Sequence, residues 1–377
     1  MKTINFCRGT CRACLAAGLA VFGATANAYG KHDTVVHSFT GGSDGGTPAA
    51  SFVADSDGNL YSTALSGGSF GNGIVFRIAP NGTETVLHSF AGGVDGAAPH
   101  AGLVSDAQGN LYGTTESGGP ANCGGGCGTV FEVLHGGGER VLHAFANSPD
   151  GANPIAALLM DGAGNLFGTT LGGGVESNFC GVGCGTVFEL SPGHKNAWTE
   201  SVIYSFKGSG NDATNSGSNL IEDNAGNLFG TATIGGDYSK CDSGGCGAVF
   251  ELSPPGAGGW TERLLHVFEG GTDGSSPYAG LIADGAGNLY GATFEGGGGN
   301  KVCNFLSSGC GIVFRLAPDG EETILHTFTG APKDGESPQA SLFADGKGNL
   351  IGTTVEGGSS HNCFENEGCG TVFTLRK

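Results

Sequence analysis

The stretch LVSDAQGNLYGTT at residues 103–115, followed by CGTVFEV at 127–133 and RVLHAF at 140–145, indicates the architecture of the whole chain. It contains four short runs rich in Val, Leu, Thr, Tyr and Phe, and turn-forming residues separate one run from the next. Such runs are typical of β-strands joined by tight turns, and no apolar pattern with helical spacing continues through them. The runs are Leu103–Asp106, Asn110–Thr115, Gly128–Val133 and Arg140–Phe145. The stretch therefore predicts one four-stranded antiparallel unit.

The same unit recurs six times along the 377 residues. Its Gly-Asn-Leu motif places asparagine at positions 59, 110, 165, 227, 288 and 349. Four short strands at a period of this length are the sequence pattern of propeller blades. The chain also opens with a run of the fourth type, Thr34–Phe39, and ends with one of the third type, Thr371–Leu375. We therefore predict an all-β fold, a six-bladed β-propeller with four-stranded blades, whose ring is closed by the N-terminal strand completing the last blade.

The first 28 residues have the composition of a secretory signal. Three basic residues precede an apolar stretch at 13–24, and Ala26-Asn27-Ala28 fits a cleavage site. Residues 1–28 are thus predicted to be a signal peptide, and 29–377 a single propeller domain. No later segment is apolar enough to predict a transmembrane helix. We expect a secreted protein, extracellular or periplasmic, and a monomer.

Three of the 13 cysteines lie in the predicted signal, and the other ten form five closely spaced pairs. An even number of cysteines in an exported chain predicts disulfides. Zinc is the alternative, because paired cysteines can bind it, but no histidine stands at a fixed distance from the pairs. The predicted bonds are Cys123–Cys127, Cys180–Cys184, Cys241–Cys246, Cys303–Cys310 and Cys363–Cys369.

The chain is acidic, with 16 basic and 35 acidic residues and a net charge of −19. Such a field repels nucleic acid, anionic lipid and polyanionic polysaccharide. The expected partners are therefore a neutral glycan, a cationic ligand or another protein, and no nucleic acid. Equally, the charge could serve only to keep an exported protein soluble.

An aspartate recurs in the loop that joins one repeat to the next. The positions are Asp44, Asp95, Asp150, Asp212, Asp273 and Asp334. A ring of carboxylates around a central channel could bind Ca²⁺, the one cofactor that the sequence suggests. Alternatively, each aspartate caps its own turn before glycine, which requires no convergence.

A histidine recurs in the fourth strand of the repeat. It occupies positions 37, 88, 143, 266 and 326, and Tyr204 replaces it in the fourth repeat. Strand alternation predicts that Val86, His88 and Phe90 share one face. The histidines are then either packed, hydrogen-bonded parts of the scaffold or members of a ligand ring.

The fourth repeat departs most from the pattern. DATNSGSNL at 212–220 replaces D-G-x-x-P-x-A-x-L, in addition to the change of histidine to tyrosine. A unique site in a ring of similar units has to lie where the symmetry fails. The candidate ligand-binding residues are therefore Tyr204, Asp212, Asn215 and Asn219, although simple sequence drift explains them as well.

The units GGVDGAAPHAGLVSDAQGNLYGTTESGG at 92–119 and CGTVFEVL at 127–134 resemble the GloVer tandem repeat. The resemblance covers residues 34–377. It implies a propeller-like exported or surface protein of bacteria, of the kind described as having a choice of anchor. It implies no catalytic residues, and this chain shows no sorting or membrane tail that would support surface attachment.

The sequence contains no acid–base or nucleophile constellation that would identify an enzyme. We expect an exported, disulfide-braced binding or interaction module, acting outside the cell or at its surface. Its recognition face would be the end of the blades with the longer loops. The alternative is a carbohydrate-active or lactone-cleaving enzyme, which rests on fold analogy alone. Whether the protein is catalytic stays open.

Overall fold

The computed structural model describes residues 35–376, apart from 121–122, 177–179, 181–182, 209–211, 242–243, 257–258, 299–302, 304–308 and 360–367. The predicted signal peptide therefore lies outside the described residues. Two short 3-10 turns, η1 at Gly93–Asp95 and η2 at His194–Asn196, are the only helical segments in this part of the chain. No helix among the described residues has the length and hydropathy needed to cross a bilayer.

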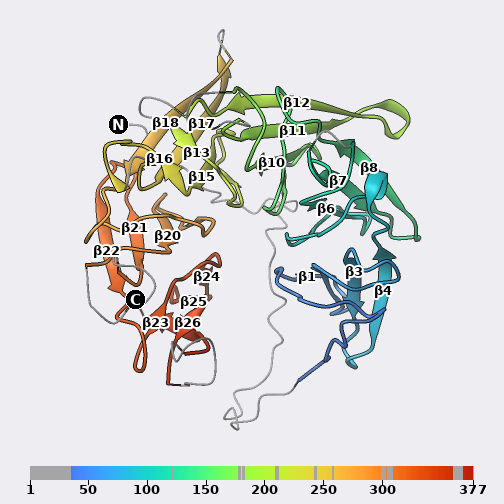
Figure 1. Cartoon of the computed structure of the whole chain (residues 1–377), viewed down its shortest axis with the longest axis horizontal. Helices are drawn as coiled ribbons and strands as arrows, with labels where there is room; N and C mark the ends of the chain where they lie inside the picture. The colour runs from blue at the N-terminus through green and yellow to red at the C-terminus, as the bar shows by residue number, and fades with distance from the viewer. Residues whose placement is uncertain are drawn as a thin grey trace. The chain divides into compact units, whose positions relative to one another are not determined.

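Six antiparallel sheets, one per repeat, are the blades of the fold (Figure 1). The first two contain β1 (Val53–Ala54), β2 (Leu60–Ala64), β3 (Ile74–Ile78) and β4 (Glu84–Ser89), then β5 (Val104–Ser105), β6 (Leu111–Thr115), β7 (Thr129–Val133) and β8 (Glu139–Ala144). The next two contain β9 (Leu159–Met160), β10 (Leu166–Thr170), β11 (Thr186–Pro192) and β12 (Trp198–Ser205), then β14 (Ile221–Glu222), β15 (Leu228–Ala232), β17 (Ala248–Gly256) and β18 (Gly259–Val267). The last two contain β19 (Ile282–Ala283), β20 (Leu289–Thr293), β21 (Ile312–Leu316) and β22 (Glu322–Thr327), then β24 (Phe343–Ala344), β25 (Leu350–Thr354) and β27 (Thr371–Leu375). The predicted all-β, six-bladed propeller is confirmed.

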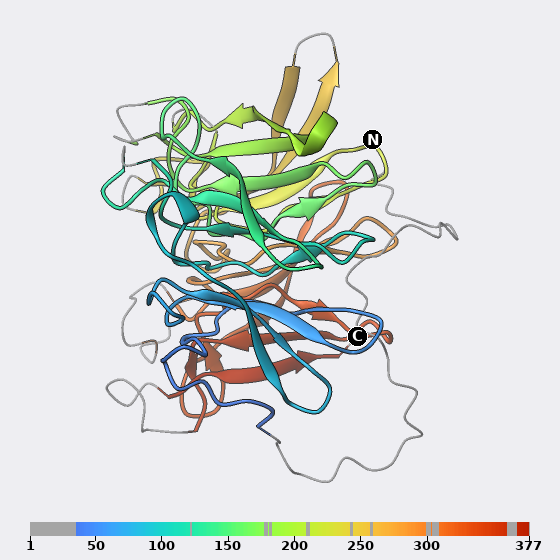
Figure 2. The same ribbon diagram turned by 90° about the vertical axis from the view of Figure 1, so that its right-hand side faces the viewer.

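Two further pairs of short strands lie in the loops, β13 (Ala213–Thr214) with β16 (Ile234–Gly235) and β23 (Gly335–Glu336) with β26 (Glu356–Gly357). The longest hairpin is β17–β18 of the fourth repeat (Figure 2). The sheet of the sixth repeat has three strands, and residues 35–39 belong to no strand. Closure of the ring by Thr34–Phe39 therefore stays a prediction.

The chain divides into two compact units. One comprises residues 35–167 with Glu189–Ser201, and it holds the sheets of the first two repeats. The other comprises Gly168–Phe188 with residues 202–376, and it holds the sheets of the last three. The third repeat contributes strands to both.

The D-x-x-G-N turn ends the first strand of each blade. In the second repeat, Asp106 Oδ1 accepts hydrogen bonds from the backbone N–H groups of Gln108 (2.9 Å) and Asn110 (2.8 Å). Its Oδ2 accepts a third from Asn110 Nδ2 at 2.8 Å. Gly109, with φ of 81°, supplies the left-handed residue that the turn needs. The turn begins so early that only Val104–Ser105 is left for the first strand.

Glycine in the second strand lets the aromatic core close. A Cβ on Gly230 would lie 2.6 Å from Cζ of Phe250 and 3.0 Å from Cδ2 of Leu220. The phenylalanine is fully buried, so there is no free space for a side chain at this position. In the first repeat Ser62 replaces the glycine, and Phe52 takes the place of the leucine and is 53% exposed. The larger residue at position 62 thus accompanies an outward displacement of its neighbour.

One non-glycine residue with positive φ recurs in the loop after each inter-repeat aspartate. These residues are Thr47, Ala98, Asn153, Asn215, Ser276 and Ser337, with φ between 54° and 59°. In the five from Ala98 onward, the backbone N–H donates to the preceding repeat, for example Asn153 to Cys127 O and Ser276 to Cys246 O, both at 2.8 Å. The second cysteine of a pair therefore accepts a hydrogen bond from the next repeat.

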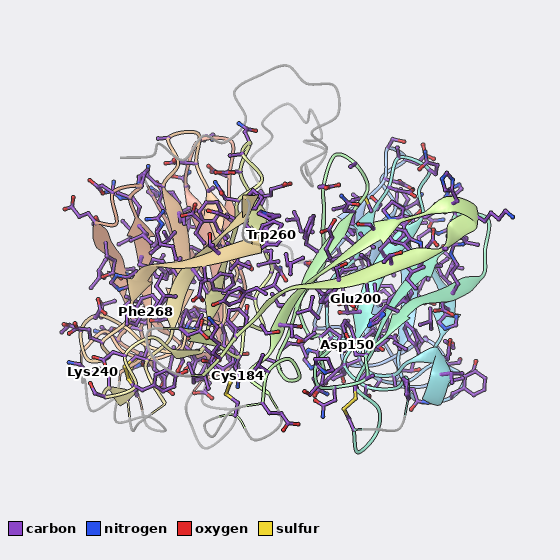
Figure 3. All side chains as sticks on the ribbon, turned by 90° about the horizontal axis from the view of Figure 1, so that it is seen from above. Asp150, Cys184, Glu200, Lys240, Trp260 and Phe268 are labelled. Atoms are coloured by element: carbon purple, nitrogen blue, oxygen red, sulfur yellow. A yellow bond between two sulfur atoms is a disulfide. The ribbon has the colours of Figure 1, made fainter. Side chains whose placement is uncertain are left out.

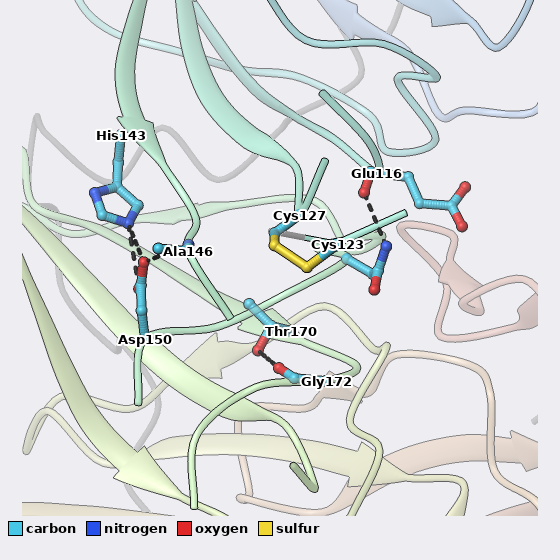
Figure 4. The surroundings of a disulfide bond; sticks show 9 residues. Glu116, Cys123, Cys127, His143, Ala146, Asp150, Thr170 and Gly172 are labelled. Carbon is cyan, nitrogen blue, oxygen red and sulfur yellow. Dashed lines mark hydrogen bonds and ion pairs between the residues drawn. A yellow bond between two sulfur atoms is a disulfide. The ribbon is translucent and has the colours of Figure 1, made fainter. Parts of the chain in front are cut away.

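Four predicted disulfides are confirmed: Cys123–Cys127, Cys180–Cys184, Cys241–Cys246 and Cys303–Cys310. Cys369 is also disulfide-bonded, and its predicted partner Cys363 lies outside the described residues. Figure 4 shows the first of these bonds. All four close short loops at the end of the blades opposite the D-x-x-G-N turns, so they brace loops and not the strands of the sheets.

Candidate functional site

A β-bulge in the fourth strand determines where the recurrent histidine points. In β4, His88 pairs with Val75 but Val86 pairs with Phe76, so Leu87 is the extra residue. Directly opposed residues share a face, and Val75 and Phe76 point to opposite faces. The prediction that Val86 shares a face with His88 is therefore wrong, because the bulge interrupts the alternation. The same register shift occurs in β8, β18 and β22.

Each histidine faces the aspartate of the loop that follows it. The Nε2–Oδ distance is 3.1 Å in His88–Asp95, His143–Asp150 and His326–Asp334, 3.4 Å in His266–Asp273 and 3.9 Å in His37–Asp44. Figure 4 shows the His143–Asp150 pair. The histidine ring also packs against the core: the ring centroids of His143 and the buried Phe145 are 4.8 Å apart. The two recurrent sets that the sequence predicts separately thus form one set of pairs.

The aspartates also cap their own loops. Asp150 Oδ2 accepts a hydrogen bond from Ala146 N at 2.9 Å, and Asp273 Oδ2 accepts one from Glu269 N at 2.7 Å. The equivalent bond is present for Asp44, Asp95, Asp212 and Asp334. This is the turn-capping role. The ring of carboxylates binding Ca²⁺ stays a prediction, with each aspartate committed to its own loop and its own histidine or tyrosine.

In three of these pairs a glutamate from the following repeat joins the histidine and the aspartate, and the sequence pattern did not lead us to it. One ligand atom each of His143, Asp150 and Glu200 lie within 4.8 Å of one another, and Asp150 and Glu200 are seen together in Figure 3. The equivalent sets are His88, Asp95 and Glu139, and His266, Asp273 and Glu322. The available signal was the spacing E-x-x-x-[HY]-x-F, in which glutamate precedes the histidine or tyrosine by four residues at Glu84, Glu139, Glu200, Glu262 and Glu322.

These glutamates are held where a negative charge is unfavourable. Burial, followed by the negative charge of Asp95, raises the pKa of Glu139 to about 8. Burial also raises the pKa of Glu322 to about 7, against the lowering effect of His266. The pKa of Glu200 is raised as well, by burial and then by the charge of Asp150. Each cluster therefore favours a bound cation or proton.

Where the third and fourth repeats join, the predicted residues Tyr204 of β12 and Asp212 of the following loop lie together, and Glu262 of β18 joins them. The Tyr204 hydroxyl donates to Asp212 Oδ1 at 2.9 Å and lies 3.3 Å from Glu262 Oε2. Ala213 N donates to Glu262 Oε1 at 3.2 Å. Burial, then the hydrogen bond and charge of Asp212, raise the pKa of Glu262 to about 9. A hydroxyl has one hydrogen to donate, so a proton on Glu262 completes this network.

Glu262→Gln should make the stability of the protein less sensitive to alkaline pH. The folded-state pKa of Glu262, about 9, lies above its usual 4.5, so the folded protein retains a proton that the unfolded chain loses. That contribution is fully present below pH 4.5 and is lost as the pH rises toward 9. A difference of one pH unit between the folded and unfolded pKa corresponds to about 1.4 kcal/mol. Glutamine keeps the donor without titrating, so urea denaturation at pH 5 and pH 9 should show a smaller decline in the variant.

A matched control is Glu321→Gln, an exposed carboxylate in the turn before β22, which should leave the decline of stability with pH as it is in the parent chain. Equal declines in the parent chain and the Glu262→Gln variant would contradict the assignment of a retained proton to this glutamate.

The other two candidate residues of the fourth repeat lie elsewhere in the loop. Asn215 is the positive-φ residue that every repeat has, and its N–H donates to Cys184 O at 3.0 Å. It therefore does not break the symmetry of the backbone. Asn219 lies beside Gly280 of the next repeat, where an added Cβ would meet Asn219 Cβ at 3.2 Å. Whether these four residues bind a ligand stays a prediction.

Two variable positions stand on a common backbone bridge at the loop-rich end. The residue after the second strand donates its N–H to the positive-φ residue, as in Glu116 N to Ala98 O and Phe294 N to Ser276 O, both 3.0 Å. The backbone bond recurs at Leu65, Thr233 and Val355. The residue 16 positions earlier lies in the preceding loop. Its side chain meets that of the later residue in two repeats: His100 Nε2 is 3.9 Å from Glu116 Oε2, and the ring centroids of Tyr278 and Phe294 are 5.5 Å apart. Along the sequence, the residues at these two positions are Ala49/Leu65, His100/Glu116, Ile155/Leu171, Gly217/Thr233, Tyr278/Phe294 and Gln339/Val355. The bridge is repeated, but the side chains differ from one repeat to the next.

Comparison with known proteins finds no curated protein that matches the chain. Among solved structures, a gluconolactonase-like protein is 15% identical (TM-score 0.42, covering 80% of this chain and 81% of that one). A luciferin-regenerating enzyme is 14% identical (TM-score 0.46, covering 88% and 91%). The extracellular domain of a protein assigned to a one-component system of B. thetaiotaomicron is 13% identical (TM-score 0.42, covering 88% and 38%). Similarities this low carry no argument about function.

The comparison with family models identifies the family of this chain. A model described as the Gloeobacter/Verrucomicrobia repeat matches residues 20–243 and 238–377, which together span nearly the whole chain. The repeat that its sequence resembles and the repeat that the family model matches are the same, and this chain belongs to the Gloeobacter/Verrucomicrobia repeat family.

Proposed function

We propose that this protein is an exported binding module whose recognition surface is the loop-rich end of its blades. The observation that supports this most is the set of paired variable positions. Their backbone is repeated, with the same N–H to carbonyl bridge, while the side chains vary from His100/Glu116 to Tyr278/Phe294. Variation at a fixed geometry is what a surface needs in order to present different contacts on a constant frame.

The chemistry of this surface favours neutral sugars as ligands. Tyr278 is 46% exposed, and its ring packs edge-on against Phe294 with centroids 5.5 Å apart. Exposed aromatic rings with a polar handle can pack against the apolar faces of sugars. The net charge of −19 disfavours anionic polysaccharides. Disulfides at the same end are consistent with action in an oxidising compartment outside the cytoplasm.

Binding should be lost when the aromatic pair is removed. We expect the purified chain to bind a member of a panel of neutral glycans, and Tyr278→Ala with Phe294→Ala to weaken that binding at least tenfold. The reason is that the double variant removes both rings and leaves the backbone bridge in place. Isothermal titration with the glycan selected from the panel measures the effect.

The matched control is Gln108→Ala with Lys347→Ala, two exposed residues in the D-x-x-G-N turns at the opposite end. This variant should bind like the parent chain. Equal loss in both variants, or no glycan bound by the parent chain, would count against the proposal. Release of sugar or hydrolysed lactone from the panel would instead assign the enzymatic alternative.

A further inference from the structure

We propose that three of the blade junctions bind Zn²⁺ through one histidine, one aspartate and one glutamate each. The ligand sets are His88/Asp95/Glu139, His143/Asp150/Glu200 and His266/Asp273/Glu322. The histidine and aspartate come from one repeat and the glutamate from the next, so each ion would join two neighbouring repeats.

The spacing of the donor atoms fits a metal ion. Within each set one atom per residue lies within 4.8 Å of the others. The histidine and aspartate atoms are closer, 3.1 Å apart in His143–Asp150 and 3.4 Å apart in His266–Asp273. Two ligands at about 2.0–2.2 Å from a tetrahedral Zn²⁺ lie roughly 3.4 Å from each other. The donors therefore need little rearrangement to enclose an ion.

The types of donor select the class of metal. Imidazole nitrogen suits Zn²⁺ and other transition metals, whereas Ca²⁺ and Mg²⁺ prefer an all-oxygen set. Two carboxylates balance the charge of a divalent ion. Three protein ligands also leave a fourth tetrahedral position for water. This site differs from the all-aspartate Ca²⁺ ring that the sequence suggests, because it is local to each junction and includes nitrogen.

A second observation points to a missing partner in these clusters. Glu139 Oε1, Glu200 Oε1 and Glu322 Oε1 are buried and have no hydrogen-bond partner among the described residues. A buried acceptor without a partner costs about 1–3 kcal/mol. In the fourth repeat, which has tyrosine, both oxygens of Glu262 have partners, Ala213 N at 3.2 Å and the Tyr204 hydroxyl at 3.3 Å. The tyrosine cluster therefore provides a hydrogen-bond partner for each glutamate oxygen, whereas in the three histidine clusters one glutamate oxygen has none among the described residues.

The chain supplies its own variants for the test. His143→Tyr copies the fourth repeat and should fold with one site fewer, and Tyr204→His copies the other repeats and should add one. Untagged protein would be stripped with EDTA, loaded with Zn²⁺, desalted and analysed for metal by mass spectrometry. We expect three ions per parent chain, two in His143→Tyr and four in Tyr204→His. Zn²⁺ should also raise the Tm of the parent chain more than that of His143→Tyr.

Exposed histidine provides the control for adventitious binding. His100, whose side chain is 41% exposed and 3.9 Å from Glu116, belongs to none of the sets, so His100→Gln should retain three ions. No Zn²⁺ retained by the parent chain, or the same count in all variants, would overturn the proposal and leave a shared proton as the partner of each glutamate. A parallel loading with equal Zn²⁺ and Ca²⁺ after which only Ca²⁺ is retained would overturn it in favour of the aspartate ring. Glycan binding is measured separately, so either proposal can fail alone.

Discussion

Arg140→Thr should lower the free energy of unfolding by about 3 kcal/mol, the lower end of the range for breaking a buried ion pair from one side. Arg140 in β8 lies opposite Glu132 in β7, and the two form an ion pair. The glutamate side chain is only 2% exposed, whereas the arginine is 31% exposed. Among the described residues, the buried carboxylate then keeps only the Tyr112 hydroxyl, 3.0 Å from Glu132 Oε1, and that hydroxyl lies equally close to Asp106 Oδ2. Urea denaturation at neutral pH measures the loss.

The first and fifth repeats provide the compensating change. There an arginine occupies the position of Glu132 and a threonine that of Arg140, as in Arg77 and Thr85, joined by a hydrogen bond of 3.3 Å. The double variant Glu132→Arg with Arg140→Thr should therefore recover most of the stability. A double variant no more stable than Arg140→Thr alone would show that the loss does not come from the unpaired carboxylate.

Gly230→Ser should destabilise the protein by about 2–3 kcal/mol, in the range typical of overpacking a close-packed core. The new Cβ would lie 2.6 Å from the ring of Phe250 and 3.0 Å from Leu220, both of which are buried. The Phe250 ring also packs edge-on against Phe206 of the preceding repeat, with centroids 5.5 Å apart, so it cannot move without disturbing that contact. Thermal or urea unfolding followed by circular dichroism measures the effect.

Ser62→Gly in the first repeat is the reverse change at the equivalent position. Ser62 is buried, and its hydroxyl donates to Ser51 O at 3.1 Å, so we expect only about 1 kcal/mol from the lost hydrogen bond. If both substitutions had the same effect, crowding by Phe250 and Leu220 would not explain the Gly230 result.

The sequence predicts those parts of the structure that depend on neighbouring residues. The D-x-x-G-N turn, the strands on either side of it and the disulfides each need only a few consecutive residues, and all are found as expected among the described residues. The clusters at the blade junctions are different. Glu200 is 50 residues from Asp150 along the chain, so their proximity depends on how consecutive blades stack.

One wrong prediction has a local physical cause. The bulge at Leu87 reverses the alternation of side chains, and nothing in the residue types around it marks the extra residue. Asn215 looks unique by composition, yet Thr47, Ala98 and Ser276 adopt the same left-handed conformation in the other repeats. A shared backbone torsion imposed by the loop leaves no common side-chain chemistry to recognise.

The hydrogen bonds from the left-handed residues to cysteine carbonyls give the disulfides a mechanical meaning. The carbonyl of Cys127 or Cys246 accepts a backbone hydrogen bond from the next repeat. The disulfide constrains the loop that contains this carbonyl. The disulfides therefore restrict the loops through which neighbouring repeats contact each other. A chain folded under reducing conditions should form the same blades, because the disulfides lie outside the sheets. The connections between those repeats that have a cysteine pair should then be less rigid.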